Sequence, residues 1–420
     1  MVKKKIEKPR RELTKRQLSR WQQQKRRQRI TVGLGLFIIV VVLGIIVGGW
    51  YVTQYRPLRQ TVIKVNDTEF DMNYYLKMLK FYGEGQSINY MYGLADGMVT
   101  IIGRNELVQQ EAMKLGISVS NETVDEELKS YEPPLSKDYR DLVRADMLRS
   151  RLRDEYFEQK VPVSAEHRHI MAILLESENQ ATEVRARLEN GENFADLAGE
   201  LSLEGLSKIE KGDLGWRAED VLAVLLNTSI PGEYAFSSEV EVLSQPMYDE
   251  VVTKGVGYWL IEVLDREEET GKVNVRVILL GSEGEAQEVR ARSEAGEDFA
   301  ALAQEVSQDY LSGSNGGNVG WVDTGILSPA FNEFVLEAEL ETLSEPVRDE
   351  MVSTTGGYWL LKVLGMDGNR KISDEDRVLL KTQALSDWIL ELENDPENKV
   401  ESYLDDEKKA WAIEQAMKNN

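Results

Sequence analysis

The sequence predicts an α+β protein that begins with a membrane-spanning helix and carries two copies of one small α+β domain. Three observations predict this: an uncharged apolar run near the N-terminus, two related segments of about one hundred residues, and amphipathic helical stretches that flank them. At 420 residues the chain is long enough for two to four domains of ordinary size. Its apolar content of 42% is that of a globular protein, which argues against a largely disordered chain.

Charge is distributed unevenly along the chain. Residues 1–30 hold thirteen Lys and Arg against two Glu, and residues 31–52 carry no charge. Because the whole chain has a net charge of −23, the part that follows Val52 carries about −34. A region this acidic repels DNA, RNA and anionic lipid, so we expect no nucleic acid among the partners of this protein.

The apolar run at residues 31–52 is long enough to cross a lipid bilayer. At a rise of 1.5 Å per residue, about twenty-two helical residues span a hydrocarbon core of ~30 Å. Trp50 and Tyr51 stand where aromatic residues gather at a membrane surface. The positive-inside rule places the basic tail, residues 1–30, in the cytoplasm and residues 53–420 outside it. This predicts a single-pass protein of a bacterial-type plasma membrane.

A cleaved signal peptide is the alternative interpretation of the apolar run. The run is too long for one, thirty residues precede it, and no small-x-small cleavage site follows it, so we adopt the uncleaved anchor. The chain has no cysteine, which excludes a lipidated N-terminal Cys, disulfides and thiolate metal sites. His167 and His169 are the two histidines, and zinc at such a pair would need further ligands. We therefore expect neither a metal nor a cofactor.

Self-similarity at a spacing of about one hundred residues sets the architecture. In the best-matched segment, ten of fifteen positions are identical at an offset of 105, and further along the chain the offset becomes 100. The matching segments are, in pairs, 185–199 and 290–304, 212–216 and 317–321, 243–246 and 343–346, and 257–264 and 357–364. A repeat of this length is a duplicated domain rather than a solenoid unit.

Each copy predicts the same order of elements: an apolar strand, a helix that ends before a glycine, a second helix, a glycine loop and a closing strand. The expected elements are strands at 172–175 and 277–280, helices at about 178–189 and 283–295, second helices that start near Phe194 and Phe299, and closing strands around Tyr258 and Tyr358. We therefore predict two tandem domains, residues 166–268 and 273–366, each with strands of its own at both ends.

The segments on either side of the repeats are mainly helical. Residues 57–163 predict a short strand at 61–66 followed by helices, with Ser120 as a helix N-cap. Residues 374–420 predict an amphipathic helix. Its apolar face carries Leu385, Trp388, Ile389 and Leu392. This face has to be buried, because an isolated helix with an exposed apolar stripe is unstable and prone to associate. We expect it to pack on the N-terminal region and to complete a helical domain there.

The ordered motifs of the two copies resemble the parvulin family of peptidyl-prolyl isomerases. These motifs are G-x-x-F-A-x-L-A, G-x-x-G-W, L-S-x-P and a terminal G-Y-x-(I/L)-(I/L)-x-V, and they cover residues 170–265 and 275–365. Together with the anchor and the flanking helices, the layout resembles the SurA- and PrsA-type extracytoplasmic foldases. This resemblance implies two parvulin-like domains beside a helical chaperone domain. It also implies clients that are unfolded or newly exported polypeptides.

The resemblance also implies where the site lies and how far it has degenerated. Active parvulins use two histidines to stabilise the twisted prolyl bond, whose isomerisation barrier is ~18–20 kcal/mol. The first position falls on Ala172 and Val277, and the second falls on Trp259 and Trp359. A register slip that would make His169 the missing histidine needs a three-residue insertion and reverses the strand face. We therefore name no catalytic residue with confidence in either copy.

The second copy retains more of the family pattern than the first. Asp309 stands at the acidic position, and Leu327 and Phe331 stand at the positions of the apolar pocket. Trp359 would then form the floor of a substrate-binding groove beside them. Core packing is the competing interpretation of the tryptophans, Leu327 and Phe331, and capping of a loop is the competing interpretation of Asp309.

The sequence therefore predicts an anchored extracytoplasmic chaperone that binds unfolded or exported polypeptides and has degenerate isomerase sites. One alternative is an active isomerase that works through the second parvulin-like domain, and another is an envelope scaffold. Detectable isomerisation of a proline peptide would distinguish the active isomerase. Binding to many different unfolded chains would distinguish a chaperone from a scaffold.

Overall fold

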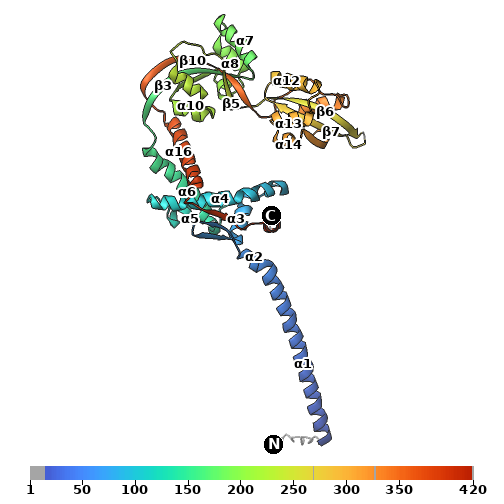
Figure 1. The fold of residues 1–420 in the computed structure, drawn as a ribbon. Coiled ribbons are helices and arrows are strands. Elements are labelled where there is room, and N and C mark those ends of the chain that lie inside the picture. The colour runs from blue at the N-terminus through green and yellow to red at the C-terminus, as the bar shows by residue number, and fades with distance from the viewer. Residues whose placement is uncertain (1–14, 268, 326–327, 419–420) are drawn as a thin grey trace, which may run out of the picture. The chain divides into compact units, whose positions relative to one another are not determined.

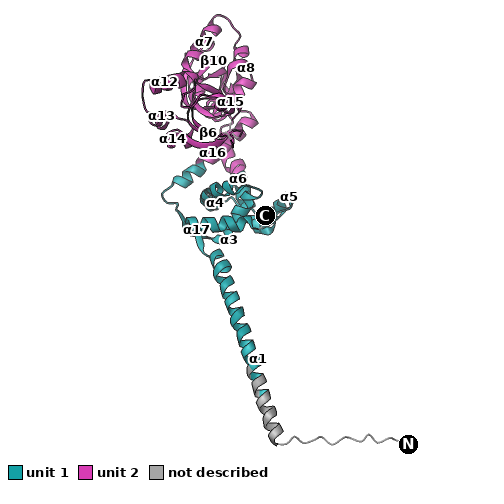
Figure 2. Cartoon of the chain, turned by 90° about the vertical axis from the view of Figure 1, so that its right-hand side faces the viewer, with its two compact units in different colours: residues 1–150, 388–420 teal, residues 151–387 magenta. Residues whose placement is uncertain are grey.

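The computed structural model describes residues 15–267, 269–325 and 328–418, which form two compact units (Figure 2). Unit 1 comprises residues 1–150 and 388–420, and unit 2 comprises residues 151–387. Helices and strands alternate throughout unit 2, and unit 1 combines helices with one small sheet. The predicted α+β fold class is thus confirmed.

A long helix opens unit 1. Helix α1 (Lys15–Trp50) continues through a π-helical turn, Tyr51–Tyr55, into α2 (Arg56–Leu58) (Figure 1). Among the described residues, Thr31–Leu58 is the one helical stretch that is long and apolar enough to cross a membrane, and its most apolar part is entirely unburied.

The remainder of unit 1 is helical around a three-stranded sheet of order β11-β1-β2. Its elements are β1 (Thr61–Val65), β2 (Thr68–Asp71), α3 (Met72–Gly83), α4 (Ile88–Lys114), α5 (Asn121–Ser130), a 3₁₀ turn at Lys137–Tyr139, α6 (Arg140–Arg151), β11 (Val400–Ser402) and α17 (Asp406–Met417). Polar caps begin the helices, because each cap oxygen accepts a bond from a backbone N–H that has no partner within the helix. Ser120 caps α5 as predicted, and its Oγ accepts from the backbone N of Thr123 at 3.1 Å.

The two ends of unit 1 share one hydrophobic core. Strand β11 pairs antiparallel with β1, and Ala412, Ile413 and Ala416 of α17 are buried against α3 and α4. The sequence predicts one amphipathic helix over residues 374–420, with its apolar face in what is α16 (Asp374–Asn394). Leu385, Ile389 and Leu392 of α16 are buried, but the separate helix α17 is not predicted. A short helix with alanines on its buried face gives a weak hydrophobic pattern, so the signal for α17 was small.

Unit 2 contains both copies of the repeat. The elements of the first copy and its lead-in are short helical turns at Leu152–Tyr156 and Phe157–Gln159, β3 (Ser164–Leu175), α7 (Glu178–Glu189), α8 (Phe194–Leu201), α9 (Gly205–Ile209), β4 (Asp213–Arg217), α10 (Glu219–Leu226), α11 (Ile230–Ser237), β5 (Met247–Lys254) and β6 (Gly257–Glu267). Those of the second copy are β7 (Lys272–Leu280), α12 (Glu283–Glu294), α13 (Phe299–Val306), α14 (Tyr310–Ser314), β8 (Asn318–Asp323), α15 (Pro329–Glu337), β9 (Val347–Asp349) and β10 (Thr354–Lys371). The beginning of α16 follows β10.

The helices of the repeats begin and end close to where the sequence predicts. Ser177 and Ser282 cap α7 and α12 through bonds from the backbone N of the third residue of each helix. Gly191 and Gly296 follow these helices at φ values of 93° and 98°, a left-handed conformation that glycine adopts without steric cost. The helix boundaries are therefore decided locally.

The strands do not pair as the sequence predicts, because the two copies exchange their closing strands. We expected β6 to close the first copy and β10 to close the second. The first sheet instead has the order β4-β3-β10-β5, and the second has the order β8-β7-β6-β9 (Figure 1). Leu360 of β10 lies opposite Ile173 of β3, and Leu260 of β6 lies opposite Ile278 of β7. The second sheet is therefore nested within the first along the chain, and a division at residues 268–273 does not follow the sheets.

The L-S-x-P motifs bind the exchanged strands. The Oγ of Ser244, in the first copy, accepts from the backbone N of Leu361 at 2.9 Å, and the Oγ of Ser344, in the second copy, accepts from the backbone N of Ile261 at 2.9 Å. The link between β6 and β7 is short. Only four residues separate these strands, so the two strands form an antiparallel hairpin directly.

Candidate functional site

A cavity of about 600 Å³ opens on one face of the second sheet, and we call it the second-sheet cavity. Strands β6, β7, β8 and β9, helices α14 and α15 and the segment after β9 contribute its walls. It is lined by Trp259, Val275, Val277, Asp309, Leu311, Ser312, Asn318, Val319, Ser328, Phe331, Asp349, Met351 and Val352. The lining is therefore mainly apolar, with a few polar groups that converge on it, which is the usual composition of a ligand pocket.

Trp259 is held in the wall of this cavity by Asp349. Its indole Nε1 donates to Oδ2 of Asp349 at 3.0 Å, and the hydroxyl of Ser328 donates to the same oxygen. The other carboxylate oxygen accepts from the backbone N of Met351 at 2.9 Å. Asp349 is only 2% exposed, so these donors satisfy a carboxylate that would otherwise be costly to bury. The indole meets the ring of Phe331 edge-to-face at 5.5 Å.

The structure brings together Val277 and Trp259 in the lining of the second-sheet cavity, two residues that the resemblance to parvulins places at histidine positions. Val277 is 1% exposed, and its backbone N donates to the carbonyl O of Gly317 at 2.8 Å. Because of the strand exchange, the partner of Val277 is the tryptophan of the first copy. Ala172, the equivalent of Val277, shares a buried cluster with Trp359 in the first sheet. Each site thus combines positions from both repeats.

Trp359 does not lie where we expected it, beside Phe331. It is fully buried in the core of the first sheet, and its Nε1 donates to Oδ2 of Asp249 at 2.9 Å. Phe331 is 5% exposed and both joins the core of the second sheet and lines the second-sheet cavity. Leu327 lies outside the described residues.

The sequence left two interpretations of Asp309 open, a cap and a residue of the site, and the structure agrees with both. It caps α14, because Oδ2 accepts from the backbone N of Ser312 at 2.9 Å and from the hydroxyl of Ser312. It also lines the second-sheet cavity. Within the described ranges, no Lys, Arg or His is among the residues that line this cavity, so its electrostatic character is set by Asp309 and Asp349.

The corresponding region of the first sheet is filled by its own side chains. The segment after β4 forms two helices there, α10 and α11, and Leu222 and Leu226 of α10 are packed around Trp359. Leu206 of α9 also joins this cluster, whereas its equivalent in the second copy, Leu311, is 77% exposed. Side chains of α9 and α10 therefore occupy this space in the first copy.

Exposed apolar side chains border the second-sheet cavity. Leu311, Val319 and Met351 are 77%, 43% and 74% exposed. Neighbouring Tyr310 is 83% exposed on the same short helix. Apolar surface gathered at the rim of a cavity is typical of a binding site for another chain or ligand.

The two histidines lie on β3, and neither of them lines the second-sheet cavity. The imidazole Nδ1 of buried His167 is 3.0 Å from the carbonyl O of Ala165. The Nε2 of His169 is 2.7 Å from Oδ1 of Asp213, and its ring lies against Trp216. His169 is on the strand face opposite Ala172, which argues against the register slip. Among the described residues, no group of three or more His, Asp or Glu side chains is placed to hold a metal ion.

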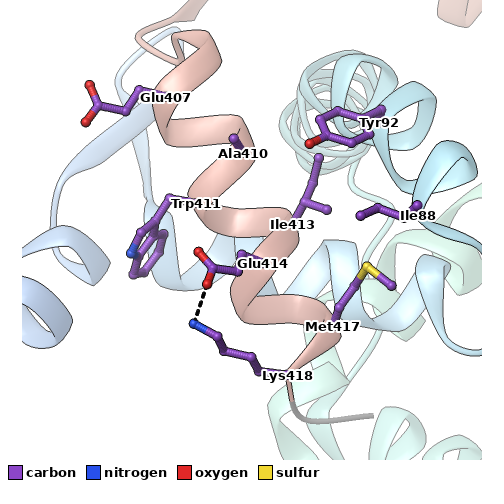
Figure 3. A pocket seen from close by; sticks show the side chains of 9 residues that line it. All are labelled: Ile88, Tyr92, Glu407, Ala410, Trp411, Ile413, Glu414, Met417 and Lys418. Atoms are coloured by element: carbon purple, nitrogen blue, oxygen red, sulfur yellow. Dashed lines mark ion pairs between the residues drawn. The ribbon is translucent and has the colours of Figure 1, made fainter.

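A further cavity, of about 610 Å³, lies in unit 1 between α17 and the start of α4 (Figure 3). Ile413 and Met417 of α17 point toward Tyr92 and Ile88 of α4, and an ion pair between Glu414 and Lys418 borders the cavity. The remaining lining residues are Glu407, Ala410 and Trp411. We call this cavity the α4–α17 cavity.

The tyrosines and methionines of the N-terminal helices divide between core and surface. Tyr75, Met78, Met91 and Met98 are buried. Tyr90 and Tyr92 are each 51% exposed, and Ile88 is 50% exposed. Two of these exposed residues, Ile88 and Tyr92, line the α4–α17 cavity.

Comparisons with known proteins agree with the repeats. The family model of the PPIC-type PPIASE domain, Rotamase, matches residues 169–265 and 281–365. The SurA chaperone of Chromohalobacter salexigens is 34% identical over 193 residues, which are 42% of this chain and 41% of that protein. The SurA chaperone of Alcanivorax borkumensis is 26% identical over 440 residues, which cover 89% of this chain and 97% of that protein.

The extent of these matches differs between relatives. The chain spans less than two thirds of the length of several SurA chaperones that it matches. The crystal structure of the peptidylprolyl isomerase PrsA from Bacillus anthracis matches 77% of this chain and 96% of its own at 13% identity, with a TM-score of 0.20. The matched PPIC-type segments, the SurA relatives and the two repeated sheets agree: residues 169–265 and 281–365 belong to the parvulin-type peptidyl-prolyl isomerase family, and the chain is similar to SurA chaperones.

Proposed function

We propose that this protein is a membrane-anchored folding chaperone of the cell envelope. Its second parvulin-like domain binds apolar segments of unfolded or newly exported polypeptides, and its isomerase sites are degenerate. One observation carries the proposal: the second-sheet cavity keeps its apolar walls and rim, while Val277 and Trp259 occupy both histidine positions. The names of the SurA relatives, which are called chaperones, support the same function.

Binding in this cavity rests on the removal of apolar surface from water. A proline ring or another apolar side chain of a client would be buried against Trp259, Phe331 and Val277, and Leu311 and Met351 would cover its flanks. Burial of one such side chain contributes about 1.5–3 kcal/mol before ordering costs. That range fits weak, reversible capture of many sequences rather than tight recognition of one.

The isomerase site is degenerate because the residues at its two histidine positions offer no free hydrogen-bond donor to a twisted amide. Catalysis needs donors aimed at the groups whose charge changes as amide resonance is lost. Aliphatic Val277 offers no such donor, and the indole N–H of Trp259 is already bonded to Asp349. The cavity would therefore bind a prolyl peptide without lowering its barrier much.

The α4–α17 cavity supplies a second surface for clients in unit 1. Six of its nine lining residues are apolar or aromatic, and exposed Tyr92 and Ile88 stand at its edge. Two apolar sites on one chain raise the effective concentration of an unfolded client that carries several apolar segments. Such avidity suits a chaperone.

Anchoring through the bilayer is part of the proposal. The unburied apolar stretch within Thr31–Leu58 and the basic residues before it support a cytoplasmic N-terminus and an extracytoplasmic remainder. Protease added to intact spheroplasts should digest the chain beyond about Tyr55 and leave the basic tail protected. Protection of unit 2 from the protease would contradict this orientation.

The chaperone activity is tested with the full chain in lipid nanodiscs. Aggregation of several unrelated, chemically denatured proteins is followed by light scattering, and binding of a labelled apolar peptide is followed by anisotropy. The double variant Leu311→Ser/Met351→Ser should weaken peptide binding by about fivefold to tenfold and reduce the suppression of aggregation. Ile209→Ser is the matched control, because Ile209 is also 77% exposed and lies in the first copy.

The outcomes separate the chaperone from the other functions. Equal effects of the double variant and of Ile209→Ser would mean that the second-sheet cavity is not the client site. Failure of the native chain to suppress any of the aggregation reactions would favour an envelope scaffold instead.

A slow isomerase is the second candidate function. The observation that favours it is the presence of Asp309 and Ser312 in the wall of the second-sheet cavity, where polar groups could contact a prolyl amide. A coupled assay with a proline tetrapeptide, run on the native chain and on Asp309→Ala, tests it. Measurable catalysis that Asp309→Ala abolishes would establish this function.

A further inference from the structure

The two exchanged strands are almost identical in sequence. Over eight residues, β6 and β10 differ only at Ile261 against Leu361 and at Glu262 against Lys362. Either strand therefore presents nearly the same apolar side chains to either sheet. Packing of these eight residues does not specify which strand closes which sheet, because volume-conserving exchanges of this kind change core stability little.

The tryptophan and serine anchors of the closing strands do not specify the pairing either. Trp259 donates to Asp349, and Trp359 donates to Asp249. If each copy closed its own sheet, Trp259 would meet Asp249 and Trp359 would meet Asp349, so both bonds would form again. The same holds for the bonds to Ser244 and Ser344, because residues 261 and 361 donate through their backbones.

The charges at residues 262 and 362 do distinguish the two pairings. Glu262 of β6 lies opposite Arg276 of β7, and its Oε2 is 2.5 Å from Nε of the guanidinium. The side chain of Glu262 is only 10% exposed, so this ion pair is poorly screened by solvent. In the first sheet, Nζ of Lys362 is 2.6 Å from Oε2 of Glu241.

In the alternative pairing, these interactions would become unfavourable on balance. Glu262 would enter the first sheet, where Glu241 stands in place of a cation. Lys362 would enter the second sheet opposite Arg276. Glu341, the equivalent of Glu241, would be available to Lys362, but Arg276 would lose its carboxylate. Like charges that face each other across strands destabilise a sheet. A buried charged side chain that has lost its partner destabilises the fold by more than this repulsion does.

We propose that Glu262 and Lys362 specify the strand exchange, and so determine that Trp259 rather than Trp359 lines the second-sheet cavity. The pair acts as a charge code that selects one of two closures with nearly equal packing. This use of charge to specify register and partner is known from paired helices, and the same physics applies between strands. The proposal concerns the pairing of strands and does not depend on the proposed function.

The segments that cross between the sheets make both closures sterically accessible. Gly255 and Val256 connect β5 to β6, and four residues connect β9 to β10. In the exchanged form these segments run side by side, with Thr354 opposite Lys254. In the alternative form each would become a hairpin turn, with Gly255 in the first segment and Gly356 and Gly357 shortly after the second. Short connections of this kind are where strands are exchanged between domains.

Disulfide trapping tests the proposal, because the native chain has no cysteine to interfere. Tyr248→Cys/Tyr358→Cys reports the exchanged form, since these residues are cross-strand partners in β5 and β10. His169→Cys/Asp265→Cys reports the alternative form. In the structure His169 lies opposite Gly365, and Asp265 is the equivalent residue of β6. Cross-strand Cα atoms are about 4.5–5.5 Å apart, within the range of a disulfide.

Both pairs are placed in the full chain, which is unfolded in urea, refolded in nanodiscs and then oxidised. Peptide mapping under non-reducing conditions measures the fraction of each disulfide. We expect the 248–358 disulfide to exceed the 169–265 disulfide by about tenfold or more. Equal yields in the native background would overturn the proposal.

Reversal of the charge code is the decisive variant. Glu262→Lys/Lys362→Glu keeps the composition and the net charge, and it should reverse the ratio of the two disulfides. A folded reversal variant that still forms only the 248–358 disulfide would overturn the proposal. If the reversal variant does not fold, Glu262→Gln/Lys362→Gln answers the same question. It should form both disulfides in comparable amounts, and a neutral variant that forms only the 248–358 disulfide would likewise overturn the proposal.

Discussion

Trp259 and Asp349 belong to different copies of the repeat, yet the indole of one donates a 3.0 Å hydrogen bond to the carboxylate of the other. The bond forms because β6 closes the second sheet beside β9. It fixes the ring that faces Phe331 across the second-sheet cavity. The site is therefore a product of strand exchange.

The two tryptophans should have separable roles. Trp259→Leu should weaken the binding of an apolar peptide by about tenfold, because Trp259 lines the second-sheet cavity. Trp359→Leu should leave binding near the native value and cost about 3 kcal/mol in the free energy of unfolding, because Trp359 is fully buried. Peptide anisotropy and urea denaturation measure the two effects. The reverse assignment, with binding lost in Trp359→Leu only, would contradict the observed strand pairing.

Restored histidines should create isomerase activity only in the correct combination. Val277→His/Trp259→His places two imidazoles in one cavity, because both residues line it. Val277→His/Trp359→His is the matched control, since Trp359 lies in the core of the other sheet. A proline-tetrapeptide assay should show at least about tenfold more catalysis for the first variant than for the native chain. Equal activity of both double variants would mean that these positions do not form one site.

Charge next to the bound segment should affect affinity. The lining of the second-sheet cavity contains Asp309 and Asp349 but no described cation, so an apolar segment flanked by Lys should bind more tightly than one flanked by Glu. We expect a ratio of about threefold to tenfold at low salt that shrinks as salt is raised. Asp309→Asn should reduce this ratio and keep the α14 cap, because asparagine caps helices as well as aspartate does. An unchanged ratio in this variant would exclude Asp309 from the recognition of charge.

Lys254 should make the stability of unit 2 depend on pH. It is buried where the strands cross, and its Nζ donates to the carbonyl O of Thr355 at 3.1 Å and to that of Gly356. Burial lowers the pKa of Lys254 below its ordinary value of 10.5, and Glu285 and Glu176 oppose this effect only in part. Between the lowered pKa and 10.5, the unfolded chain binds more protons than the folded chain. The free energy of unfolding should therefore rise with pH in that window.

The variant Lys254→Gln isolates this contribution, because an amide cannot take up the proton. Urea denaturation at pH 7 and at pH 9.5 should show that native unit 2 gains stability relative to the variant as the pH rises. Parallel pH profiles for the two proteins would show that Lys254 is not the group responsible.

The C-terminal segment should be required for the folding of unit 1 but not of unit 2. Deletion of residues 400–420 removes β11 and α17, and with them Ala412, Ile413 and Ala416 from the shared core. Unit 1 should then become sensitive to limited proteolysis, whereas unit 2 should remain resistant, because both of its sheets are intact. Suppression of aggregation should fall as well. A protease-resistant unit 1 in the truncated chain would show that α17 contributes little to the core.

Much of this protein is determined by local sequence. The helix limits of each repeat follow from caps such as Ser177 and from Gly191, because each acts within one turn of its helix. The apolar stretch within Thr31–Leu58 is recognisable from its length and lack of charge. The resemblance to parvulins assigns the histidine positions from the motif order, since each motif lies within a few residues of its strand.

Only the tertiary structure decides which strands meet. Residues 257–264 and 357–364 carry the same apolar pattern, so the order of motifs cannot say whether Trp259 or Trp359 faces Val277. Strand pairing is a long-range choice that depends on partners far away in sequence, here on charged side chains such as Arg276 and Glu241 that face Glu262 and Lys362. The sequence alone therefore determines that the chain has two parvulin-like copies and where their elements begin. The pairing of the strands decides which residues share a site, because residues 257–264 and 357–364 are too alike for the motif order to tell them apart.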